Sequence, residues 1–313
     1  MIGYLIRRIL YAIPILVGVS LLTFVLFYGV SSPESIARQN MSVKNPSKTQ
    51  IHEWLTDHGY DKPLGEQFKN HMESLLLFRF GKSDRTKEPI WDRVKQGAGP
   101  SAQVAGLVLS TSLVVGLTIA MMAAYFRGSS IDRMTTLICV FMMSIVYVVY
   151  VIGLQFLLGK ILRYGPLAGY QHGGDSWKFV VLPAAIGLIA RTGSDIRLFR
   201  TFLLEEINQD YVRTARAKGV SETMVLFRHV LKNAMVPIVT STVAGVPLLI
   251  LGSLVLETYF GIPGLGSYLQ DAISSQDFAV VRAMVYLGAL LYIVGLIVTD
   301  VLYAVFDPRV RLE

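Results

Sequence analysis

Long uncharged stretches dominate the pattern of apolar and polar positions along the chain. A helix needs about 20 residues to cross the hydrocarbon layer of a membrane, which is about 30 Å thick. Five uncharged stretches approach or exceed this length: residues 9–30, 101–126, 134–159, 234–256 and 283–299, the last of which can extend through Asp300 to Phe306. The pattern predicts a membrane-spanning helix in each stretch, because such helices tolerate internal prolines.

Residues 179–190 form a sixth apolar stretch, which is short for a span because it has only 12 residues. Its length alone would also allow a re-entrant segment. If Arg7 and Arg8 hold the N-terminus inside, five spans would place the seven basic residues of 197–232 outside the cell. Cytoplasmic loops normally carry the excess of Lys and Arg. We therefore predict six membrane helices with both termini cytoplasmic.

This topology divides the all-α chain into four parts. They are the N-terminal cytoplasmic end with the first helix (1–30), an extracytoplasmic segment (31–100), a five-helix core (101–306) with a cytoplasmic loop at 201–233, and a cytoplasmic tail (307–313). The sequence "QGAGP" at 96–100 resembles a linker before the second span. The apolar run after Arg8 is too long for a signal peptide, so we interpret it as a retained anchor.

The composition agrees with a membrane protein. Hydrophobic residues make up 53% of the chain and charged residues 16%, with a mean hydropathy of +0.51. Soluble proteins average about 25% charged residues. The net charge of +7 could suggest nucleic-acid binding, but cytoplasmic Lys and Arg explain it in a membrane protein. Cys139 is the single cysteine, so no disulfide within the chain is possible.

No motif in the sequence indicates an enzyme. "FGKS" at 80–83 resembles the end of a phosphate-binding loop, but that loop requires glycine where Leu76 stands. The segment 31–100 also holds three histidines near two acidic residues: His52, His58, His71, Glu53 and Asp57. We interpret these as a solvated polar surface rather than a metal site. The sequence therefore predicts a non-catalytic chain without metal or cofactor.

Two charged residues follow the sixth apolar stretch. Arg191 and Asp195 are four residues apart, so they share a helix face and can pair. Ionisable groups at membrane depth usually face a bundle interior or an aqueous cavity. These two could therefore line a translocation path, or both could lie near the cytoplasmic end of the span, where such side chains reach the interface. Asp300 in the last span could similarly pair with a cation at the inner interface.

The sequence "DYVRTARAKGVSE" at 210–222, here called the basic segment, is the most charged part of the predicted cytoplasmic loop. Gly219 followed by Ser221 predicts a helix that stops at the glycine and a second helix capped by the serine. Val220, Met224, Phe227 and Leu231 recur at helical spacing. An interfacial helix on anionic lipid is one interpretation. The small residues Thr214, Ala215, Ala217 and Gly219 instead favour docking against a protein.

Several blocks of the sequence together resemble a known family, the B-type permease subunits of bacterial dipeptide and oligopeptide ABC importers. They are "YLIRRILYAIPILVGVSLLTF" at the N-terminus, "HGYDKPLGEQF" at 58–68, "DYVRTARAKGVSETMVLFRHVLKNAMVPIVT" from 210, "LVLETYFGIPGLGSYLQDAISSQDFAVV" at 254–281 and "DVLYAVFDPRVR" at 300–311. The resemblance covers nearly the whole chain. It departs from the family at 144–151, "SIVYVVYV", which lacks the proline common there. Arg213 and Thr214 take the places of a glutamate and an alanine of the general importer loop, a variant that is usual for the peptide subfamily.

The resemblance implies roles for particular residues. The basic segment would be a coupling helix that sits in a groove of a cytoplasmic ATPase, with six residues at its core: Arg213, Thr214, Ala215, Ala217, Gly219 and Ser221. The two last blocks would supply structural motif residues: Glu257, Pro263, Gly264, Gly266, Asp300, Asp307, Pro308 and Arg309.

The resemblance also implies a function and partners. The chain would be the permease of an ABC importer in the bacterial cytoplasmic membrane, forming half of the pathway for short peptides. Its partners would be a second homologous permease, two ATPase subunits, an extracytoplasmic substrate-binding protein and membrane lipid. The same subfamily also handles nickel complexes and some sugars. An ion-driven secondary transporter is a weaker alternative, since we find no inverted repeat.

Overall fold

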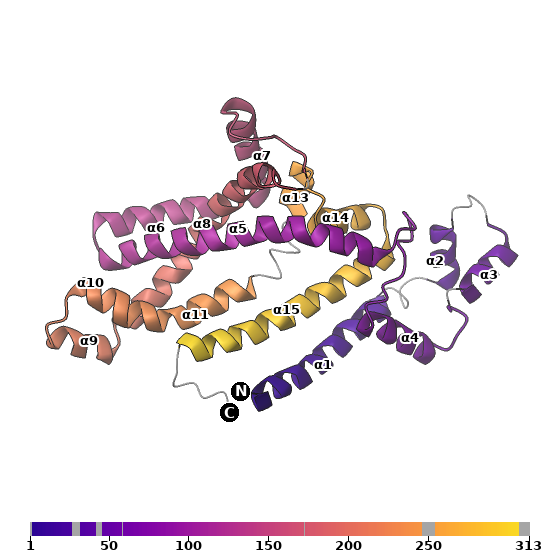
Figure 1. Cartoon of the computed structure of the whole chain (residues 1–313), viewed down its shortest axis with the longest axis horizontal. Coiled ribbons are helices and arrows are strands. Elements are labelled where there is room, and N and C mark those ends of the chain that lie inside the picture. Colours follow the sequence, from indigo (N-terminus) through magenta and orange to yellow (C-terminus); the bar gives the residue numbers. More distant parts are fainter. Residues whose placement is uncertain are drawn as a thin grey trace. The chain divides into compact units, whose positions relative to one another are not determined.

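The structure is a computed structural model, and it describes residues 2–26, 32–41, 46–57, 59–171, 173–245 and 254–306. These residues form helices joined by turns (Figure 1). Within these ranges, the only β-type pairing is an isolated bridge between Lys82 and Pro89. The chain packs into two compact units: unit 1 holds residues 1–97 and 268–293, and unit 2 holds residues 98–267 and 294–313. The predicted all-α class is confirmed.

Unit 1 joins the first helix to the small helices that follow it. It contains α1 (Ile2–Phe24), α2 (Pro33–Asn40), α3 (Lys48–Asp57), α4 (Leu64–Leu76), and parts of α5 (Ile90–Tyr125), α14 (Leu265–Ser274) and α15 (Phe278–Phe306). Phe24 of α1 packs edge-on against Phe68 of α4, with ring centroids 5.4 Å apart. Burial lowers the pKa of nearby His71 to about 4, so its imidazole is neutral at pH 7. Aromatic packing therefore anchors α4 on the end of α1.

A buried aspartate attaches the turn at residues 83–86 to the start of α15. Asp277 accepts hydrogen bonds from the hydroxyl of Ser83 and from the backbone N–H of Asp84 and Val280. The carboxylate of Asp84 in turn accepts from the N–H of Ala279 at 3.2 Å. Two carboxylates thus satisfy the free N–H groups at the N-terminus of α15, where negative charge is favourable.

Unit 2 is a bundle of longer helices. Its elements are α6 (Ser130–Met143), α7 (Tyr147–Leu154), the π-helix η2 (Gln155–Ile161), α8 (Trp177–Ile207), α9 (Asp210–Ala217), α10 (Glu222–Met224), the π-helix η3 (Val225–Val230), α11 (Leu231–Ala244) and α13 (Leu254–Phe260), with most of α5 and the end of α15. Phe199 and Leu203 of α8 lie in a buried cluster with Val212 of α9 and Ile238 of α11. Helix α8 is therefore the central support of the unit.

Three described helices are long and apolar enough to cross a membrane, namely Ile90–Tyr125, Trp177–Ile207 and Phe278–Leu302. A fourth span is possible if Ser130–Met143 and Tyr147–Ile161, which meet at an angle of 91°, count as one. The apolar part of α1 is the shorter Leu10–Phe24. Residues 246–253, inside the expected span at 234–256, lie outside the described ranges. The six-span topology therefore stays a prediction.

Two sequence expectations about helix limits are wrong. Residues 96–100 are not a linker, because α5 runs without interruption through Gly97 and Pro100. The stretch 134–159 is not one straight helix, because it bends after Met143. The hydroxyl of Tyr150 donates a hydrogen bond to the carbonyl of Met142 across this bend at 2.9 Å. The same carbonyl accepts a longer bond from the N–H of Ile145 at 3.3 Å, so the hydroxyl adds a second donor at the bend.

Candidate functional sites

The block from 257 to 267 is organised around one buried carboxylate. Glu257 is fully buried on α13. Its Oε1 accepts a hydrogen bond from the hydroxyl of Ser101 at 2.6 Å, and its Oε2 accepts one from the N–H of Ser267 at 3.0 Å. The N–H of Leu265 donates back to the Ser101 hydroxyl at 2.7 Å. Glu257 therefore ties the turn after α13 to α5, and Ser101 belongs to this site although the sequence did not indicate it.

Two glycines make room for this carboxylate. A Cβ on Gly264 would lie 2.3 Å from Oε2 of Glu257, and one on Gly266 would lie 2.7 Å from the backbone of Leu254. Real Cβ atoms do not approach so closely. Pro263, half-buried, stands between the buried residues Ile262 and Gly264. The predicted motif residues 257, 263, 264 and 266 thus form one packed turn.

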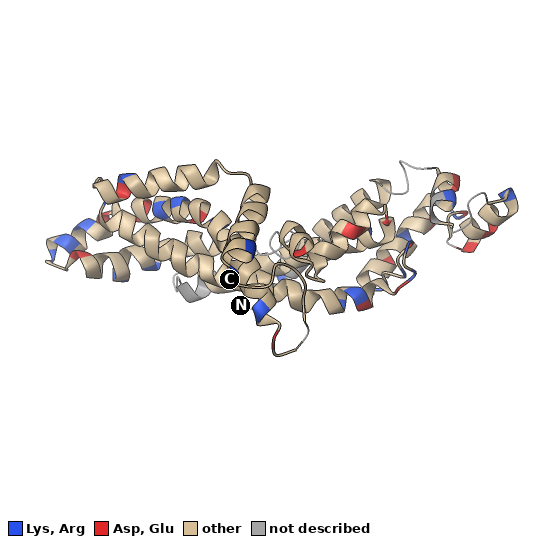
Figure 2. Cartoon of the chain, turned by 90° about the horizontal axis from the view of Figure 1, so that it is seen from above, with Lys and Arg blue, Asp and Glu red and all other residues tan. Residues whose placement is uncertain are grey.

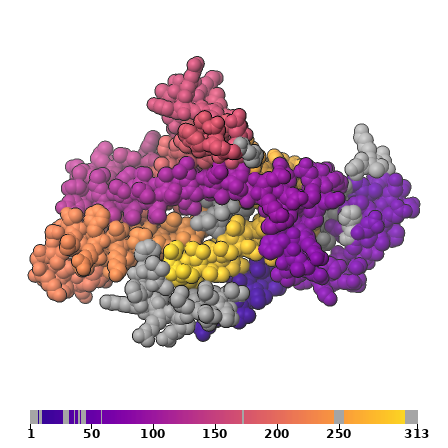
Figure 3. All heavy atoms as spheres, viewed as in Figure 1, coloured from indigo at the N-terminus to yellow at the C-terminus, as the bar shows by residue number. Residues whose placement is uncertain are grey.

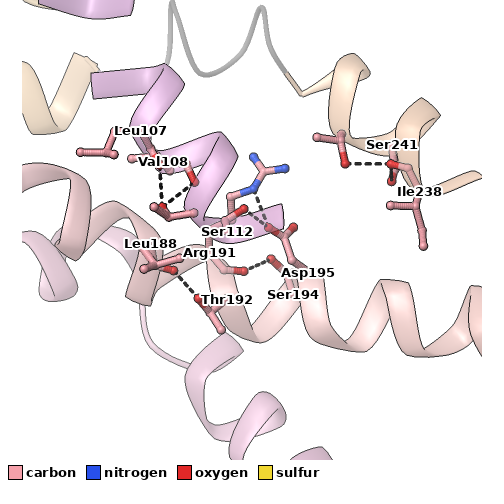
Figure 4. Close-up of polar contacts among 12 residues, drawn as sticks. Leu107, Val108, Ser112, Leu188, Arg191, Thr192, Ser194, Asp195, Ile238 and Ser241 are labelled. Atoms are coloured by element: carbon pink, nitrogen blue, oxygen red, sulfur yellow. Dashed lines mark hydrogen bonds and ion pairs between the residues drawn. The ribbon is translucent and has the colours of Figure 1, made fainter. Parts of the chain in front are cut away.

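A second site is the polar cluster of Ser112, Arg191 and Asp195, drawn in Figure 4. Nε of Arg191 donates to Oδ2 of Asp195 at 2.8 Å, so the predicted pair forms. The Ser112 hydroxyl of α5 donates to the same oxygen at 2.7 Å. The side chain of Asp195 is 9% exposed and that of Arg191 is 25% exposed. The cluster therefore lies inside the bundle, with the guanidinium at its more open side.

A second ion pair braces α6 against α8. Arg200 donates from Nε and Nη2 to the two carboxylate oxygens of Asp132, at 2.7 and 2.8 Å. The backbone N–H of Gly128 also donates to Asp132 at 3.0 Å. Such two-point contact fixes both distance and orientation. The first half of the bent pair is thus held on α8 by a pair that the sequence did not indicate.

The basic segment folds as predicted into helix, break and helix. Helix α9 ends at Ala217, Gly219 has a φ of +75°, and α10 begins at Glu222. Ser221 has the extended backbone of a cap, but its side chain makes no capping hydrogen bond. Instead Arg216 spans the break with a two-point contact to Glu222, at 2.8 and 3.1 Å.

One face of the basic segment is buried and the other is open. Val212 and Ala215 pack into the core of unit 2, so Ala215 faces its own chain. The exposed face carries the other five predicted core residues: Arg213, Thr214, Ala217, Gly219 and Ser221. Figure 2 shows basic residues gathered where α9 and α10 lie, and Figure 3 shows these helices uncovered by the rest of unit 2. The segment thus presents a small, basic and accessible surface on an apolar support.

A cavity of about 450 Å³ lies behind this surface. It is lined by residues at or just beyond the ends of α5 and α8 and by residues of α9, α10 and η3: Ala124, Tyr125, Arg127, Ile207, Asn208, Arg216, Glu222, Val225, Leu226 and Val230. Nη1 of Arg127 donates to Oδ1 of Asn208 at 3.2 Å at one side of it. The two residues that bond across the break, Arg216 and Glu222, therefore border this cavity.

The remaining predicted residues lie in various places. Asp300 is buried in unit 2. Asp307, Pro308 and Arg309 lie outside the described residues, as does His58. In the part of the chain that the structure describes, no group of three or more His, Cys, Asp or Glu side chains could hold a metal.

The chain belongs to the family of binding-protein-dependent transport system inner membrane components, whose model matches residues 116–312. The model of the N-terminal region of such membrane components matches residues 1–96. The chain is therefore an integral membrane subunit of an ABC transport system. Subunits of this family work with ATPase and substrate-binding partners and are not themselves catalytic. The resemblance found in the sequence is confirmed.

Full-length relatives carry more specific names. The chain is 31% identical over 312 residues to the glutathione transport system permease protein GsiC of Escherichia coli (strain K12), covering 99% of each chain. It is 32% identical over 318 residues to a chain of Brucella abortus (strain 2308) whose assigned name is that of a peptide transport system permease protein, covering 100% of each.

Proposed function

We propose that this chain forms half of the translocation pathway of an ATP-driven importer for short peptides in the bacterial cytoplasmic membrane. The other half is a second, homologous permease. Two cytoplasmic ATPase subunits and an extracytoplasmic binding protein complete the assembly. The names of the two relatives support short peptides as the cargo, since glutathione is itself a short peptide.

In this proposal the chain crosses the membrane six times with both termini inside. The bent pair α6–α7–η2 counts as one crossing, and α1 and the 234–256 stretch count as two more. The positive-inside rule supports the arrangement, because it places the basic segment in the cytoplasm beside the ATPase. Residues 31–100 then lie outside, where the binding protein docks.

The observation that carries the coupling role is the exposed face of the basic segment. Closing of the ATPase dimer would move α9 and α10, and their buried face would transmit this motion to α5, α8 and α11. Val212 and Ala215 on α9 and Val225 and Val230 on η3 are the buried contacts of this lever. A rigid-body switch of the bundle between outward-facing and inward-facing states would follow.

Replacing Gly219 with arginine tests this role in the assembled importer. No atom lies within 4 Å of a Cβ at this position, so a large side chain would project from the surface instead of disturbing the chain's own core. We expect stimulation of ATP hydrolysis by loaded binding protein, and peptide uptake, to fall by about tenfold or more, the effect of losing about 1.4 kcal/mol of contact.

Gly128→Arg is the matched control. Gly128 has a φ of +80° and equally open surroundings, but it lies in the turn between α5 and α6. Both variants therefore introduce similar backbone strain. Stimulation should survive in the Gly128 variant. If the Gly219 variant assembles and also keeps full stimulation and uptake, the basic segment does not couple to the ATPase.

A further inference from the structure

We propose that Arg191 binds the carboxylate of the peptide during its passage, an inference that rests on the proposed function. Short peptides differ in their side chains, but each normally ends in a carboxylate. A translocation path that accepts many sequences can still recognise this shared group. Arginine suits the task because its planar fork matches a carboxylate with two parallel hydrogen bonds.

The guanidinium of Arg191 has donors to spare. A guanidinium carries five N–H donors, one on Nε and four on the two Nη atoms. Within the described residues, Arg191 donates only from Nε, to Asp195. Figure 4 shows its two terminal nitrogens turned away from the Asp195 carboxylate, with no interaction drawn to them. The end of the fork that could bind a carboxylate is therefore uncommitted.

A glycine leaves room for the two terminal nitrogens of the fork. Gly245, just after α11, is the glycine beside it: a Cβ there would lie 3.3 Å from Nη2 and 3.4 Å from Nη1. The side chain of Arg191 is also 25% exposed, against 9% for Asp195. The more exposed side chain of the pair is thus the one that carries the free donors.

Asp195 and Ser112 suit this role for a physical reason. An isolated cation inside a membrane bundle is costly, and a peptide carboxylate would bind to it tightly and leave slowly. Asp195 compensates most of the charge and fixes the orientation of the fork, and Ser112 holds Asp195. A nearly neutral pair that still presents free N–H donors favours contact that is specific but short-lived.

Arg200 is an arginine whose fork already holds a carboxylate at two points. It lies nine residues further along the same helix and its side chain is 24% exposed, almost the same as for Arg191. It nevertheless uses Nε and Nη2 together on the two oxygens of Asp132. The two arginines therefore match in helix and exposure and differ in what the fork is bonded to, which makes Arg200 a suitable control.

The test uses the complete importer in proteoliposomes with its binding protein and ATP. Uptake is compared for a peptide with a free C-terminal carboxylate and for its C-terminal amide, chosen so that the wild-type complex imports both. The binding protein is unchanged, so its own preference cancels when each variant is divided by wild type. We expect Arg191→Gln to reduce uptake of the acid about 10-fold to 100-fold, the loss of hydrogen bonds to a charged group, and to leave the amide within about threefold.

Three further variants separate binding from structure. Arg191→Lys, which keeps the cation but loses the fork, should fall between wild type and Arg191→Gln. Asp195→Asn should slow uptake of the acid less than Arg191→Gln does and lower the peptide concentration at which its uptake is half-maximal, because the uncompensated guanidinium holds the carboxylate longer; it should leave the amide within about threefold. Arg200→Gln should reduce the acid and the amide alike.

Two outcomes would overturn the inference. One is that Arg191→Gln lowers the acid and the amide equally. The other is that Asp195→Asn lowers uptake of the acid and the amide alike, since the pair would then be structural. A wild-type complex that imports no peptide with ATP would instead contradict the proposed function.

Discussion

Glu257 illustrates how much a single buried residue organises in this chain. Its carboxylate holds the Ser101 hydroxyl of one helix and the N–H of Ser267 at the start of another. A buried acceptor of this kind is stable only when its hydrogen-bond donors are in place, because each buried group left unpaired would cost about 1–3 kcal/mol. The glycines around it are therefore part of the same site.

Gly264→Ala should be strongly destabilising for this reason. The new Cβ would collide with Oε2 of Glu257 and with the Ser101 hydroxyl, which would lie 2.5 Å away. Forcing extra volume into such a site costs about 1–3 kcal/mol. We expect a lower midpoint of thermal unfolding for the purified complex, or a lower yield of folded protein.

Gly106→Ala on α5 is the comparison, since no atom lies within 4 Å of its Cβ. It should be neutral or slightly stabilising, as alanine favours helices. Equal midpoints for the two variants would show that the turn around Glu257 is loose.

The sequence predicts contacts between residues that are close along the chain, but not contacts between distant residues. Arg191 and Asp195 were expected to pair because they are four residues apart on one helix. Ser112 contacts Asp195 across 83 residues and Ser101 contacts Glu257 across 156. Serine is common in membrane helices, and no local pattern shows which one will meet a carboxylate.

At the scale of elements, breaks were predictable only where glycine caused them. The break at Gly219 follows from a backbone conformation that glycine adopts at little cost. The bend after Met143 passes through Ser144, Ile145 and Val146, which contain neither proline nor glycine. Most sharp bends have such a residue. Here packing and the hydrogen bond of the Tyr150 hydroxyl stabilise the bend without proline or glycine. A sequence pattern does not reveal such contacts.

The π-helix η3 explains a second difference. The spacing of Val220, Met224, Phe227 and Leu231 predicts one apolar face, yet Met224 and Phe227 are 50% and 58% exposed. The buried residues are Val225, Leu226 and Val230 instead. A π-helix bonds to the fifth residue rather than the fourth, so its buried face departs from the period of 3.6 residues. The periodicity argument fails for this physical reason.

The brace between α6 and α8 gives a prediction at this scale. Among the residues that the structure describes, Arg200→Gln would leave Asp132 buried with one N–H donor, from Gly128. Removing one partner of a buried pair costs about 3–5 kcal/mol. We expect a clearly lower unfolding midpoint.

The double variant Arg200→Gln with Asp132→Asn should recover part of this loss, because no unpaired charge remains. A double variant that is less stable than Arg200→Gln alone would show that the charge of Asp132 serves something other than this pair.

For the whole molecule, the decisive question is how often the chain crosses the membrane. Between residues 53 and 205 lie α5, the bent pair and most of α8. If the bent pair crosses the membrane, there are three crossings and the two residues lie on opposite sides. If it folds back as a re-entrant segment, there are two crossings and they lie on the same side.

Cysteine labelling in cells can distinguish these cases. Cys139 is the only cysteine and is buried, so Cys139→Ala gives a background without thiols. Glu53→Cys and Glu205→Cys each replace an exposed glutamate. We expect a maleimide that cannot cross membranes to label the first in intact spheroplasts and the second only after permeabilisation. Labelling of both in intact spheroplasts would contradict six crossings.

The Asp132–Arg200 pair also has a consequence for the order in which the chain is made. Asp132 leaves the ribosome 68 residues before Arg200, a delay of about 3 to 14 seconds at ordinary rates of synthesis. During that interval the guanidinium of Arg200 is not yet available, so α6 lacks the contact that fixes it against α8. The pair can form only after Arg200 of α8 is synthesised. The packing of α6 is therefore completed by a helix that comes later in the chain.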